Sequence, residues 1–154
     1  TVTGVTSTGR MTWVRVIRGD IESPARRMET ELEMFQRLAD AAISIDQVTI
    51  NQAGVAFAVG GDRGAEVRRL MGDLNLAVRV REGCSKLSVV GSGMRNTPGV
   101  VREVVEALSR ENVEIIHCTD SNVTISILVP ADDVARAERA VHEQFHLDAG
   151  DPPS

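Results

Sequence analysis

The sequence predicts an α+β fold made of two copies of one βαββαβ unit, each with an antiparallel sheet and both helices on one face. The first observation is hydrophobic periodicity. Apolar residues recur with the period of a strand and then of a helix, in the order strand, helix, strand, strand, helix. The second is an internal repeat, since residues 34–59 align without a gap on residues 104–129 after a shift of 70 positions. The aligned apolar pairs are Met34/Val104, Phe35/Val105, Leu38/Leu108, Ile43/Val113, Ile45/Ile115, Val55/Ile125, Phe57/Ile127 and Val59/Val129.

The first half is predicted to contain five strands and two helices. Ser23 followed by Pro24 is typical of a helix start, because proline lacks the N–H that a first turn leaves unpaired. A turn is expected at Gly9–Arg10. The predicted strands are 1–8, 11–17, 43–50, 55–59 and 74–80, and the predicted helices are 24–41 and 63–73. The face of the first helix expected in the core comprises Met28, Leu32, Phe35, Leu38 and Ala39.

The second half is organised around residues 86–129. A short strand is followed by a glycine-bearing loop, GSGMRNTPG, and by a strongly amphipathic helix. Two further strands should meet at a polar corner, Asp120-Ser121-Asn122, and a second helix closes the half. The expected strands are 87–90, 113–116 and 123–129, and the expected helices are 100–110 and 131–145.

The two halves differ in their number of strands. The first has a fourth strand, whereas the second ends at its second helix, and the strand at residues 1–8 has no obvious partner. An unpaired strand exposes its N–H and C=O groups, so we expect residues 1–8 to complete the second sheet. The predicted domains are therefore 11–82 as an inserted first unit, 1–10 plus 83–147 as the second unit, and 148–154 as a flexible tail.

Composition narrows the class of protein. The chain has 154 residues, 42% of them hydrophobic and 25% charged, which is ordinary for a globular protein. A net charge of −5 and 3% aromatic residues argue against nucleic acid as a partner. No apolar run approaches the roughly 20 residues that span a bilayer, and no signal-peptide pattern opens the chain. Cys84 and Cys118 show no framework spacing, so we expect reduced thiols and a cytoplasmic protein.

Catalytic and metal motifs are not found in the sequence. It contains no Walker loop, nucleophile elbow or paired carboxylates, so we assign no catalytic residue. His142 and His146 lie four apart without a third ligand, which favours a surface or subunit contact over a metal site. His117 and Cys118 are adjacent on a strand and should point to opposite faces. We therefore expect no metal and no cofactor in this chain.

The glycine-bearing loop is the candidate binding element. Pro98 suits the first helical turn, and Gly99 leaves the backbone open to a ligand. The unpaired N–H groups of that turn and the helix dipole suit a carboxylate. The alternative, that Pro-Gly is only a good helix start, stays open on the pattern alone.

Several segments carry a family resemblance. They are VTGV at 2–5, FQRLADAAISID at 35–46, KLSVVGSGMRNTPGVVREVVEALS at 86–109, IHCTDSNVTISILV at 116–129 and AVHEQFHLD at 140–148. With them the sequence resembles tandem ACT domains, which are ferredoxin-like modules that sense amino acids. It resembles most closely the regulatory region, or β subunit, of aspartate kinase (aspartokinase). The family often has Asp-x-Pro-Gly where this chain has RGDIESP, Gln at Ile50 and Asn at Glu114. These departures look more like the branch sensitive to diaminopimelate.

The resemblance implies an allosteric regulatory module for an enzyme that phosphorylates aspartate with ATP. Its effector would be lysine, threonine or diaminopimelate, and feedback would control lysine, threonine and methionine biosynthesis. ATP and Mg would bind a catalytic domain or α subunit outside this chain. The resemblance also implies a homodimer in which the first unit of one chain meets the second unit of the other. The alternatives are a stand-alone ACT-type sensor or dimerisation module, and a small enzyme on a ferredoxin-like sheet.

Effector-binding residues are predicted in both units. The loop and first turn of the second unit should receive the carboxylate, while the start of its second strand and its corner should offer acceptors to the ammonium group. The corresponding loop of the first unit is expected to help. The predicted residues are Met94, Arg95, Asn96, Thr97, Pro98, Gly99, Val100, Glu114, Ile115, Asp120 and Ser121, with Asp20, Ser23 and Pro24 from the first unit.

Overall fold

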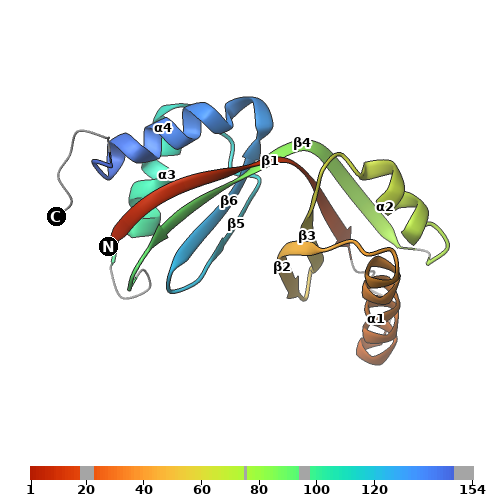
Figure 1. The fold of residues 1–154 in the computed structure, drawn as a ribbon. Coiled ribbons are helices and arrows are strands. Elements are labelled where there is room, and N and C mark those ends of the chain that lie inside the picture. The colour runs from red at the N-terminus through yellow and green to blue at the C-terminus, as the bar shows by residue number, and fades with distance from the viewer. Residues whose placement is uncertain (18–22, 75, 94–97, 148–154) are drawn as a thin grey trace. The chain divides into compact units, whose positions relative to one another are not determined.

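The computed structural model describes residues 1–17, 23–74, 76–93 and 98–147. They form two compact units: a first unit, Arg10–Glu82, and a second unit made of Thr1–Gly9 and Gly83–Ser154. Two long strands, β1 (Val2–Ile17) and β4 (Ala77–Gly91), each contribute residues to both units, whose strands belong to one six-stranded hydrogen-bonded order (Figure 1). The α+β class predicted from the sequence is confirmed.

The continuity of β1 overturns the predicted turn at Gly9–Arg10. The strand passes through these residues because a neighbouring segment holds it there: the backbone N–H of Gly61 donates to the carbonyl oxygen of Arg10 at 2.8 Å. The buried side chain of Thr12 continues this attachment, since its Oγ1 donates to Gly61 O and accepts from Arg63 N. The predicted strands 74–80 and 87–90 are likewise two parts of the single strand β4.

The first unit has the sheet order β2-β3-β1-β4. Both β1 and β2 are antiparallel to β3, and Val14 lies opposite Phe57 in the register. The two helices cover one face, where Phe57, Met34 and Leu38 form the centre of the core. The other elements of this unit are α1 (Pro24–Asp40), β2 (Ile45–Asn51), β3 (Gly54–Gly60) and α2 (Gly64–Met71).

The helix start predicted at Ser23–Pro24 is confirmed, but the predicted inward face of α1 is partly wrong. Met28 is 68% exposed and Leu32 is 70% exposed. The core is reached by Met34, which the prediction did not include, and by Phe35 and Leu38, which it did. The prediction is therefore confirmed for Phe35 and Leu38 and wrong for Met28, Leu32 and Ala39, which are exposed, so that an apolar strip of α1 lies on the surface.

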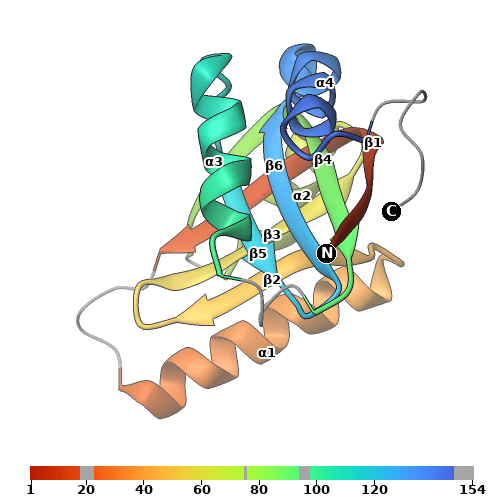
Figure 2. The ribbon, with the colours of Figure 1, turned by 90° about the vertical axis from the view of Figure 1, so that its left-hand side faces the viewer.

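The second unit has the same strand order, β5-β6-β4-β1, with the N-terminal part of β1 in the place that β4 takes in the first unit. The predicted pairing of residues 1–8 with this sheet is confirmed. Ser92 N donates to Thr1 O at 3.0 Å, and Lys86 N donates to Thr8 Oγ1 at 3.0 Å. Both helices cover one face of this sheet (Figure 2). The remaining elements are α3 (Val100–Arg110), β5 (His117–Asp120), β6 (Thr124–Pro130), the 3-10 turn η2 (Ala131–Asp133) and α4 (Val134–Gln144).

The strand predicted at 113–116 is wrong, because β5 begins only at His117. The apolar residue Val113 is used to close α3: its N–H donates to Leu108 O at 2.9 Å and its side chain is buried. The preceding residue, Asn112, is left-handed with φ 53°. The repeat extends to this detail, since Ile43 N donates to Leu38 O after left-handed Ala42 in the first unit.

Candidate effector site

The N-terminus of α3 is the centre of the candidate site. Gly99 is its N-cap residue, with φ 88° and ψ −5°, in a left-handed conformation that side-chain-bearing residues adopt at a cost. Among the residues that the structure describes, which do not include 94–97, a Cβ added to Gly99 would meet no atom within 4 Å. Val100 is buried and anchors the first turn in the core. An α-helix leaves its first N–H groups without intrahelical acceptors, so this turn can receive a carboxylate.

Pro98, Gly99 and Val100 are thus placed as a helix start. The predicted loop residues Met94, Arg95, Asn96 and Thr97, and Asp20 of the first unit, lie outside the described residues. The beginning of the loop is nevertheless located by its neighbours. Gly91 N donates to Val123 O at 2.9 Å, so the loop leaves the sheet beside the β5–β6 corner.

Ser121 has a structural task in that corner. Its Oγ accepts hydrogen bonds from Thr124 N at 3.1 Å and from Val123 N at 3.3 Å. Its own N–H donates to Thr124 O at 2.8 Å. The first unit does the same at the equivalent position, where Asn51 Oδ1 accepts from Ala53 N at 2.9 Å. A side-chain oxygen therefore closes the corner in both units, and the hydroxyl of Ser121 has little capacity left for a ligand.

Glu114 and Ile115 are not brought to the loop within their own unit. They follow the C-terminus of α3, whereas Gly99 precedes its N-terminus. A helix of 11 residues separates the two ends by about 16 Å. Glu114 is exposed, and Ile115 is half-buried against the core of the second unit. Asp120, by contrast, ends β5 at the corner and is therefore at the same end of the sheet as the loop.

In the first unit the predicted residues Ser23 and Pro24 begin α1. Ser23 Oγ accepts from Arg26 N at 3.3 Å, and Ser23 O accepts from Arg27 N at 3.1 Å. A cavity of about 510 Å³ lies beside this helix start, lined by Pro24, Arg27, Met28 and Gln52. The Nε atom of Arg27 is buried and has no hydrogen-bond partner among the described residues. The cavity therefore combines a cation with an apolar wall.

The sequence did not point to Arg27, Met28 or Gln52. Gln52 reaches the cavity only because the β2–β3 corner returns to the start of α1, which is a tertiary contact between segments 25 residues apart. Arg27 stands in an Arg/Glu-rich run that has the appearance of a solvated helix face. Neither residue carries a local signal that would have identified it.

Other candidate groups are placed as follows. In the register, His117 lies opposite Leu128 and Cys118 opposite Ile127, so their side chains point to opposite faces. Burial raises the pKa of the Cys118 thiol, and the carboxylate of Asp120 raises it further. Within the described ranges, no three His, Cys, Asp or Glu side chains form a group suited to a metal ion. Nor does any helix there combine the length and apolar character needed to cross a membrane.

Known proteins share this architecture. Residues 87–145 match the ACT domain family. Aspartokinase 1 of Bacillus subtilis (strain 168) is 34% identical over 117 residues, 76% of this chain and 29% of that protein. The aspartokinase of Corynebacterium glutamicum is 35% identical over 131 residues, 77% of this chain and 31% of that protein. The ligand-free regulatory subunit of aspartate kinase from Thermus thermophilus superposes with a TM-score of 0.79 at 25% identity, over 94% of this chain and 99% of that chain.

The strand order of the units and the family match define the class: residues 87–145 belong to the ACT domain family. The relatives narrow this class further. In particular, the chain is a regulatory region of the aspartate kinase family, as its sequence resemblance predicted. It spans less than one third of the length of the two curated relatives, at 29% and 31%.

Proposed function

We propose that this chain binds an amino-acid effector and thereby regulates an aspartate kinase. The kinase transfers phosphate from ATP to aspartate at the head of lysine, threonine and methionine synthesis, and its catalytic part with ATP and Mg lies outside this chain. We take both units as ACT domains, with the predicted limits 11–82 and 1–10 plus 83–147. The observation that carries the proposal is left-handed Gly99 at the N-terminus of α3, where an added Cβ would meet no atom of the described residues within 4 Å.

The effector is lysine, threonine or diaminopimelate in this proposal, and the three share an α-carboxylate and an α-ammonium group. The carboxylate is received by N–H groups at the start of α3, with a favourable helix dipole. The ammonium group needs acceptors, and Asp120 is the predicted carboxylate at the same end of the sheet. The first unit offers a second candidate place, the cavity in which the cation of Arg27 lies beside an apolar wall.

A homodimer completes the proposal. The edge strands of the sheet order are β2 and β5, one in each unit. Exposed apolar side chains lie on the first helix of each unit: Met28 and Leu32 on α1, and Val101 and Val105 on α3. Pairing the first unit of one copy with the second unit of the other covers such surfaces. It also offers Glu114 and Ile115 a place in the partner's site, which their own unit does not give them.

A site completed by two copies explains how binding becomes regulation. The effector favours the paired arrangement in which its contacts are complete, and it shifts the population toward that arrangement. A kinase attached to the two arrangements differently then senses the effector concentration. Whether the effector activates or inhibits the kinase depends on which of the two arrangements the active catalytic part prefers.

The test compares Gly99→Asp with Gly99→Asn. Both side chains tolerate the left-handed conformation better than most, and they differ by one charge. A carboxylate about 5 Å from the effector carboxylate, at an effective dielectric constant of about 20, costs about 3 kcal/mol, or about a hundredfold in affinity. Thermal-shift screening first selects the effector, and calorimetry then compares the variants. We expect Gly99→Asp to abolish binding and Gly99→Asn to retain more of it, with light scattering showing a dimer throughout.

Two results would contradict the proposal in different ways. Unchanged affinity in Gly99→Asp would place the effector site elsewhere. A monomer at about tens of micromolar, a range in which weak interfaces associate, would contradict the paired site.

A further inference from the structure

The first helix of the first unit is longer than its counterpart in the second unit. Helix α1 has 17 residues and α3 has 11, and their last residues, Asp40 and Arg110, correspond under the shift of 70 positions. The additional residues of α1, Pro24–Glu29, therefore all lie at its N-terminal end and form about one and a half turns. The cavity of about 510 Å³ is lined by three residues of this extension and by Gln52. Because α3 begins only at Val100, this cavity does not repeat the helix start of the second unit.

The lining residues of the cavity come from two anchored elements of the first unit. Pro24, Arg27 and Met28 lie at positions i, i+3 and i+4, which share one face of a helix. Gln52 reaches the cavity from the β2–β3 corner, where Asn51 Oδ1 accepts a hydrogen bond at 2.9 Å from the backbone N–H two residues later. A volume of about 510 Å³ falls within the range of small-molecule sites, about 300–1,000 Å³. The cavity therefore has the size of a small-molecule site.

The guanidinium group of Arg27 is the cationic part of the cavity. Its Nε atom is buried and has no hydrogen-bond partner among the described residues, and a buried donor without an acceptor costs free energy. The start of α1 is already capped, because Ser23 Oγ accepts from Arg26 N at 3.3 Å. An acceptor that enters the cavity is therefore bound by the side chain of Arg27 and not by the helix start. A carboxylate suits this group best, because its two oxygens match the donors of a guanidinium.

The rest of the lining is apolar or neutral. Met28 is 68% exposed, so its side chain and the ring of Pro24 offer apolar surface that a ligand removes from water. Gln52 adds an amide, which can both donate and accept hydrogen bonds. Among the described residues no carboxylate lines the cavity, so the side-chain ammonium group of lysine or diaminopimelate finds no counter-ion there. The lining therefore suits a ligand with one carboxylate and an apolar body better than it suits these two effectors.

We propose that this cavity is a second ligand site, which binds a small monocarboxylate with an apolar body. Arg27 pairs with the carboxylate, Met28 and Pro24 contact the apolar body, and Gln52 bonds to a further polar group such as an α-ammonium. The site belongs to the first unit and uses a side chain as its anion receptor, whereas the effector site at Gly99 uses a helix start. The two sites can therefore be tested separately.

Methyl NMR of the whole chain with isotope-labelled methionine tests the site through Met28, whose resonance is assigned with Met28→Leu. The probes are isocaproate, its uncharged amide isocaproamide, and leucine, which has the carbon skeleton of isocaproate with an added α-ammonium group. We expect isocaproate to shift the Met28 resonance saturably at concentrations up to about 10 mM, a range that detects millimolar affinity. Isocaproamide should bind at least about tenfold more weakly, because it offers Arg27 no charged acceptor.

Arg27→Gln should weaken isocaproate binding at least about tenfold, a loss typical for removing one partner of a charge pair. The matched control is Arg26→Gln, which removes the same charge from the adjacent exposed position outside the cavity lining and should stay close to the wild-type affinity. Gln52→Ala should weaken leucine binding more than isocaproate binding. Glutamine and arginine have similar helix propensities, so circular dichroism should show folded variants, and the comparison of acid with amide needs no variant at all.

Several outcomes would overturn the second ligand site. They include the absence of a saturable Met28 shift with isocaproate and leucine, equal affinities for isocaproate and isocaproamide, and equal weakening in Arg26→Gln and Arg27→Gln. Loss of isocaproate binding in Gly99→Asp would assign the binding to the effector site, whereas unchanged binding in that variant supports a separate site. A Met28 resonance that responds to protein concentration but not to the acid would assign this surface to contact with a second copy, which also overturns the proposal.

Discussion

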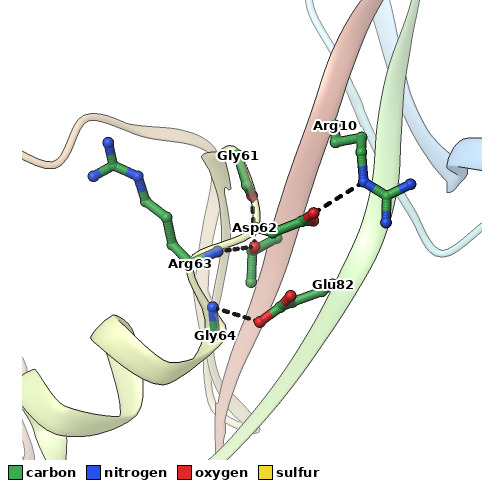
Figure 3. Close-up of polar contacts among 7 residues, drawn as sticks. Arg10, Gly61, Asp62, Arg63, Gly64 and Glu82 are labelled. Atoms are coloured by element: carbon green, nitrogen blue, oxygen red, sulfur yellow. Dashed lines mark hydrogen bonds and ion pairs between the residues drawn. The ribbon is translucent and has the colours of Figure 1, made fainter.

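Gly64→Ala should destabilise the first unit, because an alanine there displaces the carboxylate of Glu82. Gly64 begins α2, and its N–H donates to Glu82 Oε1 at 2.9 Å (Figure 3). A Cβ on Gly64 would lie 2.3 Å from that oxygen and 3.1 Å from Val80 Cγ1. The end of the Glu82 side chain can swing away, but it then loses its hydrogen bond to the helix start.

The size of the effect follows from three terms. Losing the cap on α2 costs about 1 kcal/mol, and crowding against Val80 costs about 1 kcal/mol. The better helix propensity of alanine returns about 0.5 kcal/mol at this terminal position. Gly64→Ala should therefore lower the free energy of unfolding by about 1.5 kcal/mol. In a Glu82→Ala background the cap is already absent, so the same change should cost only about 0.5 kcal/mol.

Urea unfolding followed by Trp13 emission measures this cycle, since the single tryptophan lies in the first unit. Gly60→Ala is the control, because a Cβ at Gly60 meets no atom of the described residues within 4 Å, and it should leave the free energy of unfolding nearly unchanged. Equal costs of Gly64→Ala in the two backgrounds would refute the reasoning. So would a wild-type cost below about 0.5 kcal/mol, the usual error of additivity.

Two further predictions concern the first unit. Ala42 is exposed and left-handed at φ 57°, whereas its repeat counterpart is Asn112 at φ 53°. Ala42→Asn should therefore raise the free energy of unfolding by about 0.5–1 kcal/mol. A lower free energy of unfolding in urea would contradict this. The hydrogen bond from Arg37 lowers the pKa of Asp73. The stabilisation by this hydrogen bond is therefore present above the unfolded pKa of Asp73, near 3.8, and is lost as pH falls through the lower pKa of the folded state. Asp73→Asn should therefore show a smaller loss of urea midpoint on acidification than the wild type, and parallel curves would contradict the pairing.

Local sequence determined a large part of this protein. Hydrophobic periodicity located the α-helices of the described residues, and Ser23–Pro24 marked the start of α1 with its hydrogen-bonded cap. These features depend on residues within one or two turns of each other, so a sequence can show them directly. The repeat with a shift of 70 positions also identified core partners, because pairs such as Leu38 and Leu108 are both buried. The different number of strands in the two halves was enough to predict that residues 1–8 pair with the strands of the second unit.

Tertiary structure decided where the sequence had equivalent options. Gly9 and Arg10 look like a turn, but they lie within the continuous strand β1, where Gly61 N donates a hydrogen bond to Arg10 O. Val113 is as suitable for a strand as for a helix exit, and its bond to Leu108 settles the choice. For the candidate site, the conformation of Gly99 agrees with the sequence pattern, whereas the cavity beside Arg27 depends on a corner 25 residues away. Contacts between distant segments leave no periodic signal in the chain, so only the folded structure reveals them.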